Sequence, residues 1–195
     1  MIKSIMYQVV ITFVIVFFSV AHCHASQEHE WFVSVYGGEA TDNTLYEIIF
    51  NDVRFANARF LALVLGKNLT TYKDLIRFEA EGQVVKYWGA QDNFEFNGVL
   101  LARWLPFPWD HYLDTSVAVG EGFSYATEDP EVEVENDGKT SKFLNYLAFE
   151  LDFVIPGAPN FSLFSRVHHR SGIFGLINGV HGGSNALGVG IKYSF

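Results

Sequence analysis

Residues 167–172 read VHHRSG and bring two histidines, an arginine and a serine together. An imidazole can take a proton from a serine hydroxyl, and a serine activated in this way attacks esters. Residues two apart on a β-strand share a face, so His169 and Ser171 would lie on one face and His168 and Arg170 on the other. A His-x-Ser triplet can also have no catalytic role, because polar residues are tolerated at the end of a strand. Its chemistry therefore depends on the elements that place it.

The chain begins like a secreted protein. Lys3 precedes an apolar run over residues 9–20, and Cys23-His24-Ala25 stands where a signal peptidase would cut. The run is shorter than the about 20 apolar residues of a transmembrane helix. We expect a cleaved signal peptide over residues 1–25 and a single domain over residues 26–195. A lipoprotein anchored at Cys23 is the alternative, although the residues before it make a poor lipidation signal.

Composition excludes several functions. Removal of residues 1–25 takes away the only cysteine, so no disulfide or thiol chemistry is expected. The remainder has 12 basic against 22 acidic side chains, which argues against a nucleic-acid partner. His168, His169 and His181 are the candidate zinc ligands, but the first two would point to opposite faces and no carboxylate or cysteine is spaced with them. We expect no metal and no other cofactor.

Period-two alternation recurs along the chain, whereas no segment after residue 25 shows the three-and-four spacing of an amphipathic helix. It is clearest over Phe143–Ile155, where Leu147, Phe149 and Leu151 alternate with acidic residues. The sequence therefore predicts an all-β fold. We expect eight strands, over residues Trp31–Glu39, Asn57–Gly66, Leu75–Tyr87, Phe94–Trp104, Tyr112–Phe123, Phe143–Ile155, Phe161–Arg170 and Asn185–Phe195.

A soluble sandwich or an outer-membrane barrel would both explain such alternation, since the apolar face meets a second sheet in one and lipid in the other. Three features favour the barrel. The strands are about ten residues long, enough to span a bilayer when tilted. The chain ends on Phe195 with Tyr193 two before it, which resembles the terminal signature of bacterial outer-membrane proteins. The polar faces carry charges of both signs that could pair in a narrow lumen: Arg77, Glu79, Glu81, Glu95, Arg103, Glu150, Asp152, Arg166 and Lys192.

The prediction is an eight-stranded antiparallel transmembrane β-barrel of the bacterial outer membrane. An even strand number puts both ends of the barrel chain on the periplasmic side, with longer connections outside. The long connections, around residues 40–56 and 124–142, alternate with short ones as this topology requires. Trp104, Phe107, Trp109 and Tyr112 would form part of a periplasmic aromatic girdle.

In this topology the seventh strand ends at the external rim. Its outward face would carry His169 and Ser171 near the outer leaflet, with Ser165 as an unexpectedly polar position in lipid. His168 and Arg170 would point into the lumen. A base and a nucleophile on the lipid-facing side would suit an enzyme that attacks a lipid ester.

The segments HRSGIFGLINGV and GGSNALGVGIKYSF, following a signal peptide and a barrel, resemble the PagL family of outer-membrane lipid A 3-O-deacylases. The resemblance implies an eight-stranded barrel, with His169 as general base and Ser171 as nucleophile toward an acyl ester of lipid A. An acyl-enzyme would form and water would release it. The partner would be lipid A or lipopolysaccharide of the outer leaflet. The sequence leaves open whether the barrel also forms a homodimer.

The chain departs from the family at two positions. Asn185 stands where the family has the glutamate of a Ser-His-Glu triad; an amide can hold a histidine tautomer but cannot stabilise an imidazolium by charge. Loss of a triad carboxylate can cost about 10⁴ in turnover. Glu121 is the weaker alternative acid, because the sixth strand would lie between it and His169. Gly172 offers no side-chain donor to an oxyanion, so backbone amides of the glycine-rich loop, Gly172 included, or Asn145 or Asn178 would serve.

A second function is kept beside the enzyme: a non-catalytic small outer-membrane barrel, adhesin or structural, acting through its external loops. The acidic stretch EDPEVEVENDGK over residues 128–139 is expected to be a solvated external loop. A Ca²⁺ site bridging to lipopolysaccharide is the alternative for this stretch, but its spacing matches no EF-hand loop.

Overall fold

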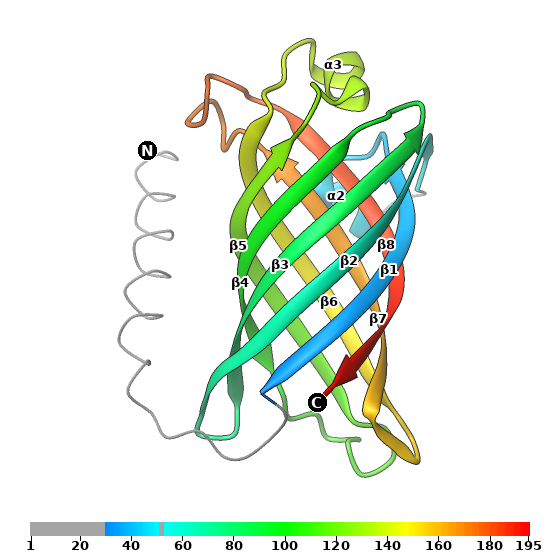
Figure 1. The fold of residues 1–195 in the computed structure, drawn as a ribbon, viewed down its shortest axis with the longest axis vertical. Helices are drawn as coiled ribbons and strands as arrows, with labels where there is room; N and C mark the ends of the chain where they lie inside the picture. The colour runs from blue at the N-terminus through cyan, green and yellow to red at the C-terminus, as the bar shows by residue number, and fades with distance from the viewer. Residues whose placement is uncertain (1–29, 51–52) are drawn as a thin grey trace.

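Eight antiparallel strands form a closed barrel in the computed structural model, which describes residues 30–50 and 53–195 (Figure 1). The expected signal peptide over residues 1–25 lies outside the described residues. The elements in chain order are β1 (Trp31–Thr41), α2 (Leu45–Phe50), β2 (Phe55–Tyr72), β3 (Ile76–Gly89), β4 (Phe94–Trp104), β5 (Thr115–Ala126), α3 (Glu131–Asp137), β6 (Phe143–Ile155), β7 (Ala158–Ser171) and β8 (Gly183–Ser194).

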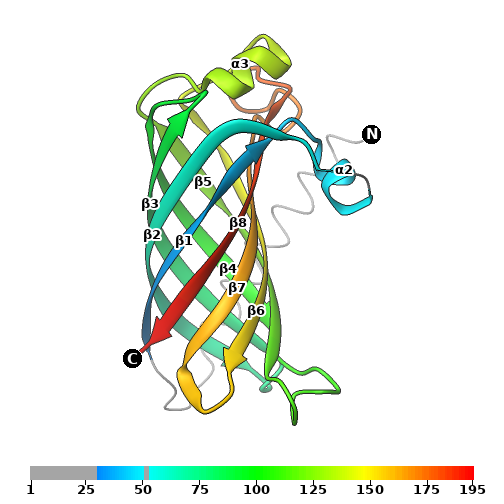
Figure 2. The same cartoon turned by 90° about the vertical axis from the view of Figure 1, so that its right-hand side faces the viewer.

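The barrel closes where β8 pairs with β1, in a register that runs from Phe32 opposite Ser194 to Thr41 opposite Asn185. The start of β1 and the end of β8 lie at one end of the barrel, and α2 and α3 lie at the other (Figures 1 and 2). Both features confirm the predicted topology. Closure leaves no strand edge without hydrogen bonds, as a hydrocarbon environment requires.

The predicted bounds of β4 and β6 agree with the structure, and those of most other strands differ by a few residues. The strand β2 is much longer than expected, with 18 residues. It runs through most of residues 67–74, KNLTTYKD, whose turn-forming residues predict a connection between the second and third strands. The expectation of no helix was wrong at two places. The helices α2 and α3 have only six and seven residues, too few to display a repeating amphipathic period.

Strand alternation separates lumen from surface as predicted. Large apolar side chains such as Leu63, Phe123 and Leu163 are exposed on the outer face. Inside, Arg103 Nε lies 2.7 Å from Glu79 Oε1, and its Nη2 lies 2.6 Å from Glu150 Oε1. The charged side chains of the lumen are therefore paired with opposite charges, which reduces the cost of burying them.

Toward the external end, aromatic side chains fill the lumen. Tyr36 packs edge-on against Phe60 with ring centroids 5.4 Å apart, and His168 lies beside Tyr146 with centroids 4.6 Å apart. His168 Nε2 lies 2.7 Å from Glu95 Oε1. His168 is thus part of the packed interior, as strand parity predicts.

The acidic loop is docked over the barrel mouth, which corrects the expectation that all of it is solvated (Figure 2). Val132 and Glu133 of α3 are buried. Arg170 Nη1 donates to Glu133 Oε1 at 2.7 Å, and Ser184 Oγ donates to the same oxygen at 2.8 Å. Burial raises the pKa of the Glu133 carboxyl, although the Arg170 guanidinium opposes this rise. Val134 on the opposite side of α3 is exposed.

Replacing Arg166 tests the lumen network. Its Nη1 lies 2.8 Å from Glu81 Oε2, and Nη2 contacts Glu150. Arg166→Leu would leave buried carboxylates with fewer counter-charges, so we expect a loss of about 3–5 kcal/mol in the free energy of unfolding, measured by urea titration in lipid vesicles. Arg59→Gln, which removes a largely exposed arginine, should cost less than about 1 kcal/mol. Equal midpoints for the two variants would contradict this account of the lumen.

Candidate functional site at the outer rim

His169 and Ser171 both lie on the outer face at the external end of β7, and both are half-buried. In the strand register His169 stands opposite Asn185 of β8, and Ser171 stands opposite Asn145 of β6. Strand pairing therefore brings together side chains from three strands on one face. Arg170, between the two, points inward and binds α3.

The imidazole of His169 is held by Asn185, whose Oδ1 lies 2.8 Å from His169 Nδ1. Asn185 is itself buried, and its Nδ2 donates to the backbone carbonyl of Asn43 at 2.8 Å. Because the amide nitrogen faces a carbonyl, the amide oxygen must face the imidazole. An oxygen acceptor at Nδ1 requires a proton there, which leaves Nε2 of a neutral imidazole as the basic atom.

This arrangement explains why an amide suits position 185. A carboxylate there would place an oxygen against the Asn43 carbonyl oxygen, where Asn185 now donates a hydrogen bond. Two acceptors without a proton between them repel, and a buried acceptor without a partner costs about 1–3 kcal/mol. Sequence reasoning did not identify Asn43. The two residues are 142 positions apart, and no local pattern signals their contact.

Within residues 30–50 and 53–195, no hydrogen bond joins the side chains of His169 and Ser171. The two Cα atoms are two residues apart on one strand, a separation of roughly 6.5–7 Å. Bringing the Ser171 hydroxyl to the imidazole therefore requires a side-chain rotation. Hydrogen bonds between a base and a nucleophile are often long without substrate and tighten when it binds.

The three candidate oxyanion donors are engaged with protein acceptors. The Gly172 N–H donates to the Gly182 carbonyl at 3.1 Å. Asn178 Nδ2 donates to Ser141 Oγ at 2.8 Å and to the Phe143 carbonyl at 3.2 Å. Asn145 Nδ2 donates to the Gly122 carbonyl at 3.0 Å and to the Glu121 carboxylate. A substrate oxyanion would have to displace one of these contacts or use another backbone amide.

Glu121 does not reach the histidine directly. In the register Glu121 stands opposite Leu147, and Leu147 stands opposite His169. Its carboxylate instead binds Asn145, the residue that pairs with Ser171. A polar row thus crosses β5 to β8 on the outer face, where large apolar side chains predominate.

The turn after Ser171 has an unusual backbone. Ile173 and Phe174 have φ angles of 50° and 54°, a left-handed conformation that costs roughly 1–3 kcal/mol for such residues. The Ile177 N–H donates to the Gly172 carbonyl at 2.9 Å and holds the turn. A Cβ on Gly172 would lie 2.1 Å from the Val180 carbonyl oxygen. The glycine is therefore required by packing, which explains the lack of a side-chain donor after the serine.

The three histidines considered as zinc ligands do not share one face of the barrel. His168 points inward and His169 outward, and His181 is exposed in the loop before β8. In the part of the chain that the structure describes, no group of three or more His, Cys, Asp or Glu side chains is placed to hold a metal ion. In the same residues no helix is long and apolar enough to cross a membrane.

The closed barrel with its apolar exterior and charged lumen has the architecture of a small eight-stranded outer-membrane β-barrel. Among solved structures it is similar to Neisserial surface protein A (NspA), with a TM-score of 0.52 and 15% sequence identity over 85% of this chain and 97% of that one. At this identity the likeness concerns the fold alone. No protein-family model and no curated protein sequence matches the chain.

Gly172→Ala tests the packing of the turn that follows Ser171. The added methyl would meet the Val180 carbonyl, so we expect a loss of about 1–3 kcal/mol in the free energy of unfolding, measured by urea titration in vesicles. Gly82→Ala is the matched control, because a Cβ there has no neighbour within 4 Å. If both variants unfold at the same urea concentration, the turn does not require glycine.

Proposed function

We propose that the chain is an outer-membrane ester hydrolase that removes an acyl chain from lipid A, by a serine and histidine mechanism similar to that of the PagL family. The contact between His169 Nδ1 and Asn185 Oδ1 carries the proposal. It leaves Nε2 as the basic atom of a half-buried imidazole, on the same outward face as Ser171. A polar catalytic pair on the lipid side would serve a substrate that is itself in the membrane.

The reaction would proceed by transfer of the acyl group to Ser171. Nε2 of His169 takes the proton of Ser171 as Oγ attacks the ester carbonyl carbon, and a tetrahedral oxyanion forms. Collapse of this intermediate breaks the ester C–O bond, and the imidazolium returns its proton to the sugar oxygen that leaves. Water then attacks the acyl-enzyme with the same histidine as base, which releases a fatty acid and restores Ser171.

Asn185 would orient the histidine without adding charge. The amide fixes the tautomer and the ring plane, but the imidazolium formed during the reaction has no carboxylate beside it. We therefore expect turnover below that of a triad with a glutamate, by a factor of up to about 10⁴. The location would be the bacterial outer membrane, with lipid A or lipopolysaccharide of the outer leaflet as the substrate.

Expression in a bacterial host should release one 3-hydroxyacyl chain from lipid A, seen as the matching loss of mass. Ser171→Ala and His169→Ala should each lower the rate of release by about a thousandfold or more, because either change removes the proton transfer to or from the nucleophile. Asn185→Ala should lower it less, since only orientation is lost.

Ser194→Ala and His111→Ala are the matched controls. Ser194 ends β8, and His111 lies in the connection between β4 and β5, so both belong to segments at the end of the barrel opposite α2 and α3. They should leave the rate unchanged. An unaltered lipid A profile with correctly folded protein in the outer membrane would rule the activity out.

Two observations favour the alternative of a non-catalytic barrel that acts through its external loops. No hydrogen bond joins His169 to Ser171 in the described chain, whereas α3 is fixed over the mouth by buried contacts and still presents Glu131, Val134 and Glu135 outward. A rigid, partly apolar acidic surface of this kind is suited to binding a partner.

Under this alternative, exchanging residues 127–142, which connect β5 to β6, for a short glycine and serine linker should abolish adhesion of expressing cells to a receptor-bearing surface. Ser171→Ala should leave adhesion intact, because the serine lies on the lipid-facing side. Loss of lipid A acyl chains without any effect of the loop exchange would favour the hydrolase.

A further inference from the structure

The lipid-facing surface of β7, β8 and β1 is furrowed rather than smooth. Val189 on β8 stands opposite Gly37 of β1 and Ser165 of β7 in the register. Because both of its lateral neighbours are small, Val189 is 70% exposed. Beyond the small residues the side chains are large again: Leu61 stands opposite Gly37, and Leu151 stands opposite Ser165. Gly37 and Ser165 therefore each lie at the bottom of a furrow, one on either side of Val189.

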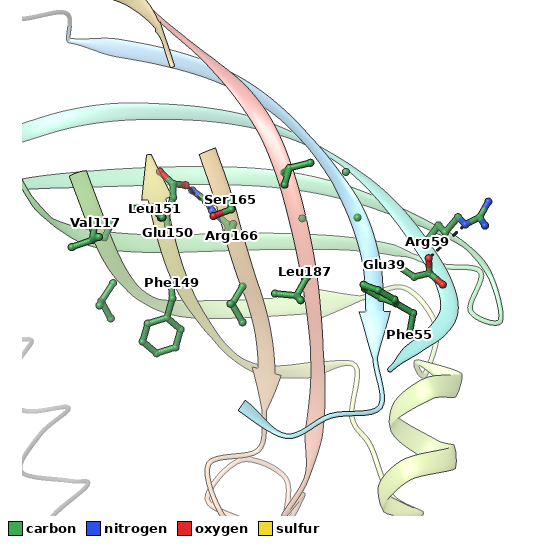
Figure 3. A pocket seen from close by; sticks show the side chains of 17 residues that line it. Glu39, Phe55, Arg59, Val117, Phe149, Glu150, Leu151, Ser165, Arg166 and Leu187 are labelled. Carbon is green, nitrogen blue, oxygen red and sulfur yellow. Dashed lines mark hydrogen bonds and ion pairs between the residues drawn. The ribbon is translucent and has the colours of Figure 1, made fainter. Parts of the chain in front are cut away.

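The furrows continue into two grooves of about 830 and 670 Å³. Both grooves share Gly37, Ser165 and Val189, and apolar side chains dominate their walls. The larger groove extends from Val117 and Phe149 on one side to Phe55 and Arg59 on the other (Figure 3). Ser165, the polar position that looks out of place in the sequence, thus acts as a small residue that deepens the groove.

Arg59 is unusual for this surface. Its side chain is 68% exposed, and its Nε lies 3.8 Å from Glu39 Oε2, a long ion pair (Figure 3). It stands near the start of β2, at the same end of the barrel as α2 and α3. A cation that faces lipid is costly unless it reaches the interface and meets an anion. Arginine matches the geometry of phosphate oxygens in particular.

We propose that this face holds one phosphate-bearing lipid of the outer leaflet, with an acyl chain in the groove beside Ser165 and its phosphate on Arg59. The exposed guanidinium at the end of an apolar groove argues for an anionic lipid over a second copy of the barrel. In the strand register Arg59 stands opposite Glu39, and Glu39 stands opposite Leu187. The pair of Leu187 and Val167 lies two residue pairs below the pair of Asn185 and His169. The lipid site does not depend on hydrolysis, and Ser171→Ala should retain it.

Native mass spectrometry of the detergent-solubilised full chain, titrated with phosphatidic acid, would test the site. We expect one lipid to bind, and Arg59→Gln to weaken its binding about tenfold, as for loss of a charged phosphate contact. Ser165→Leu should weaken it similarly by filling the groove. Diacylglycerol with the same acyl chains should bind more weakly and be insensitive to Arg59→Gln, because it has no phosphate.

Lys67→Gln is the matched control, because Lys67 lies on the same strand toward the opposite end, where it pairs with Trp31. It should leave phosphatidic acid binding unchanged. Unaltered binding in Arg59→Gln, or an equal loss in Lys67→Gln, would overturn the proposal. So would a dimer mass that Ser165→Leu abolishes while no lipid binds, since a second copy would then occupy the groove.

Discussion

Closure of the sheet between β1 and β8 is the constraint on which the rest of this structure depends. Once the two strands pair from Phe32 and Ser194 to Thr41 and Asn185, every strand has two neighbours and each side chain points either to the lumen or to the outside. Closure also brings Asn185 beside the first external loop, whose Asn43 carbonyl accepts its amide proton. The fold and the candidate site therefore arise from the same pairing.

The division into two faces determines where polar groups can be placed. In the lumen, the ion pairs around Arg103, Arg166 and Glu150 neutralise one another and fill the space. On the outside, a polar residue meets lipid or its headgroups. The polar row from Glu121 to Asn185 at the rim and Arg59 beside its groove are therefore the outer-surface features that most call for a functional explanation.

The face on which each strand residue lies could be predicted from the sequence, because side chains alternate between the two faces of a strand. Alternation predicts His169 on the outside and His168 in the lumen, and the alternating burial along β7 confirms both positions. The short helices α2 and α3 were missed since neither completes an amphipathic repeat. The Asn43 contact and the engaged oxyanion donors depend on loop conformation and side-chain rotation, which strand periodicity does not specify.

We infer that Asn185, held by Asn43, fixes His169 with its proton on Nδ1 and leaves Nε2 as a base. Nitrogen-15 NMR of histidine-labelled protein, assigned with His169→Ala, measures this tautomer directly. We expect a protonated Nδ1 and an unprotonated Nε2 for His169 near neutral pH, and loss of this preference in Asn185→Ala. A proton on Nε2, or a tautomer that Asn185→Ala leaves unchanged, would contradict it.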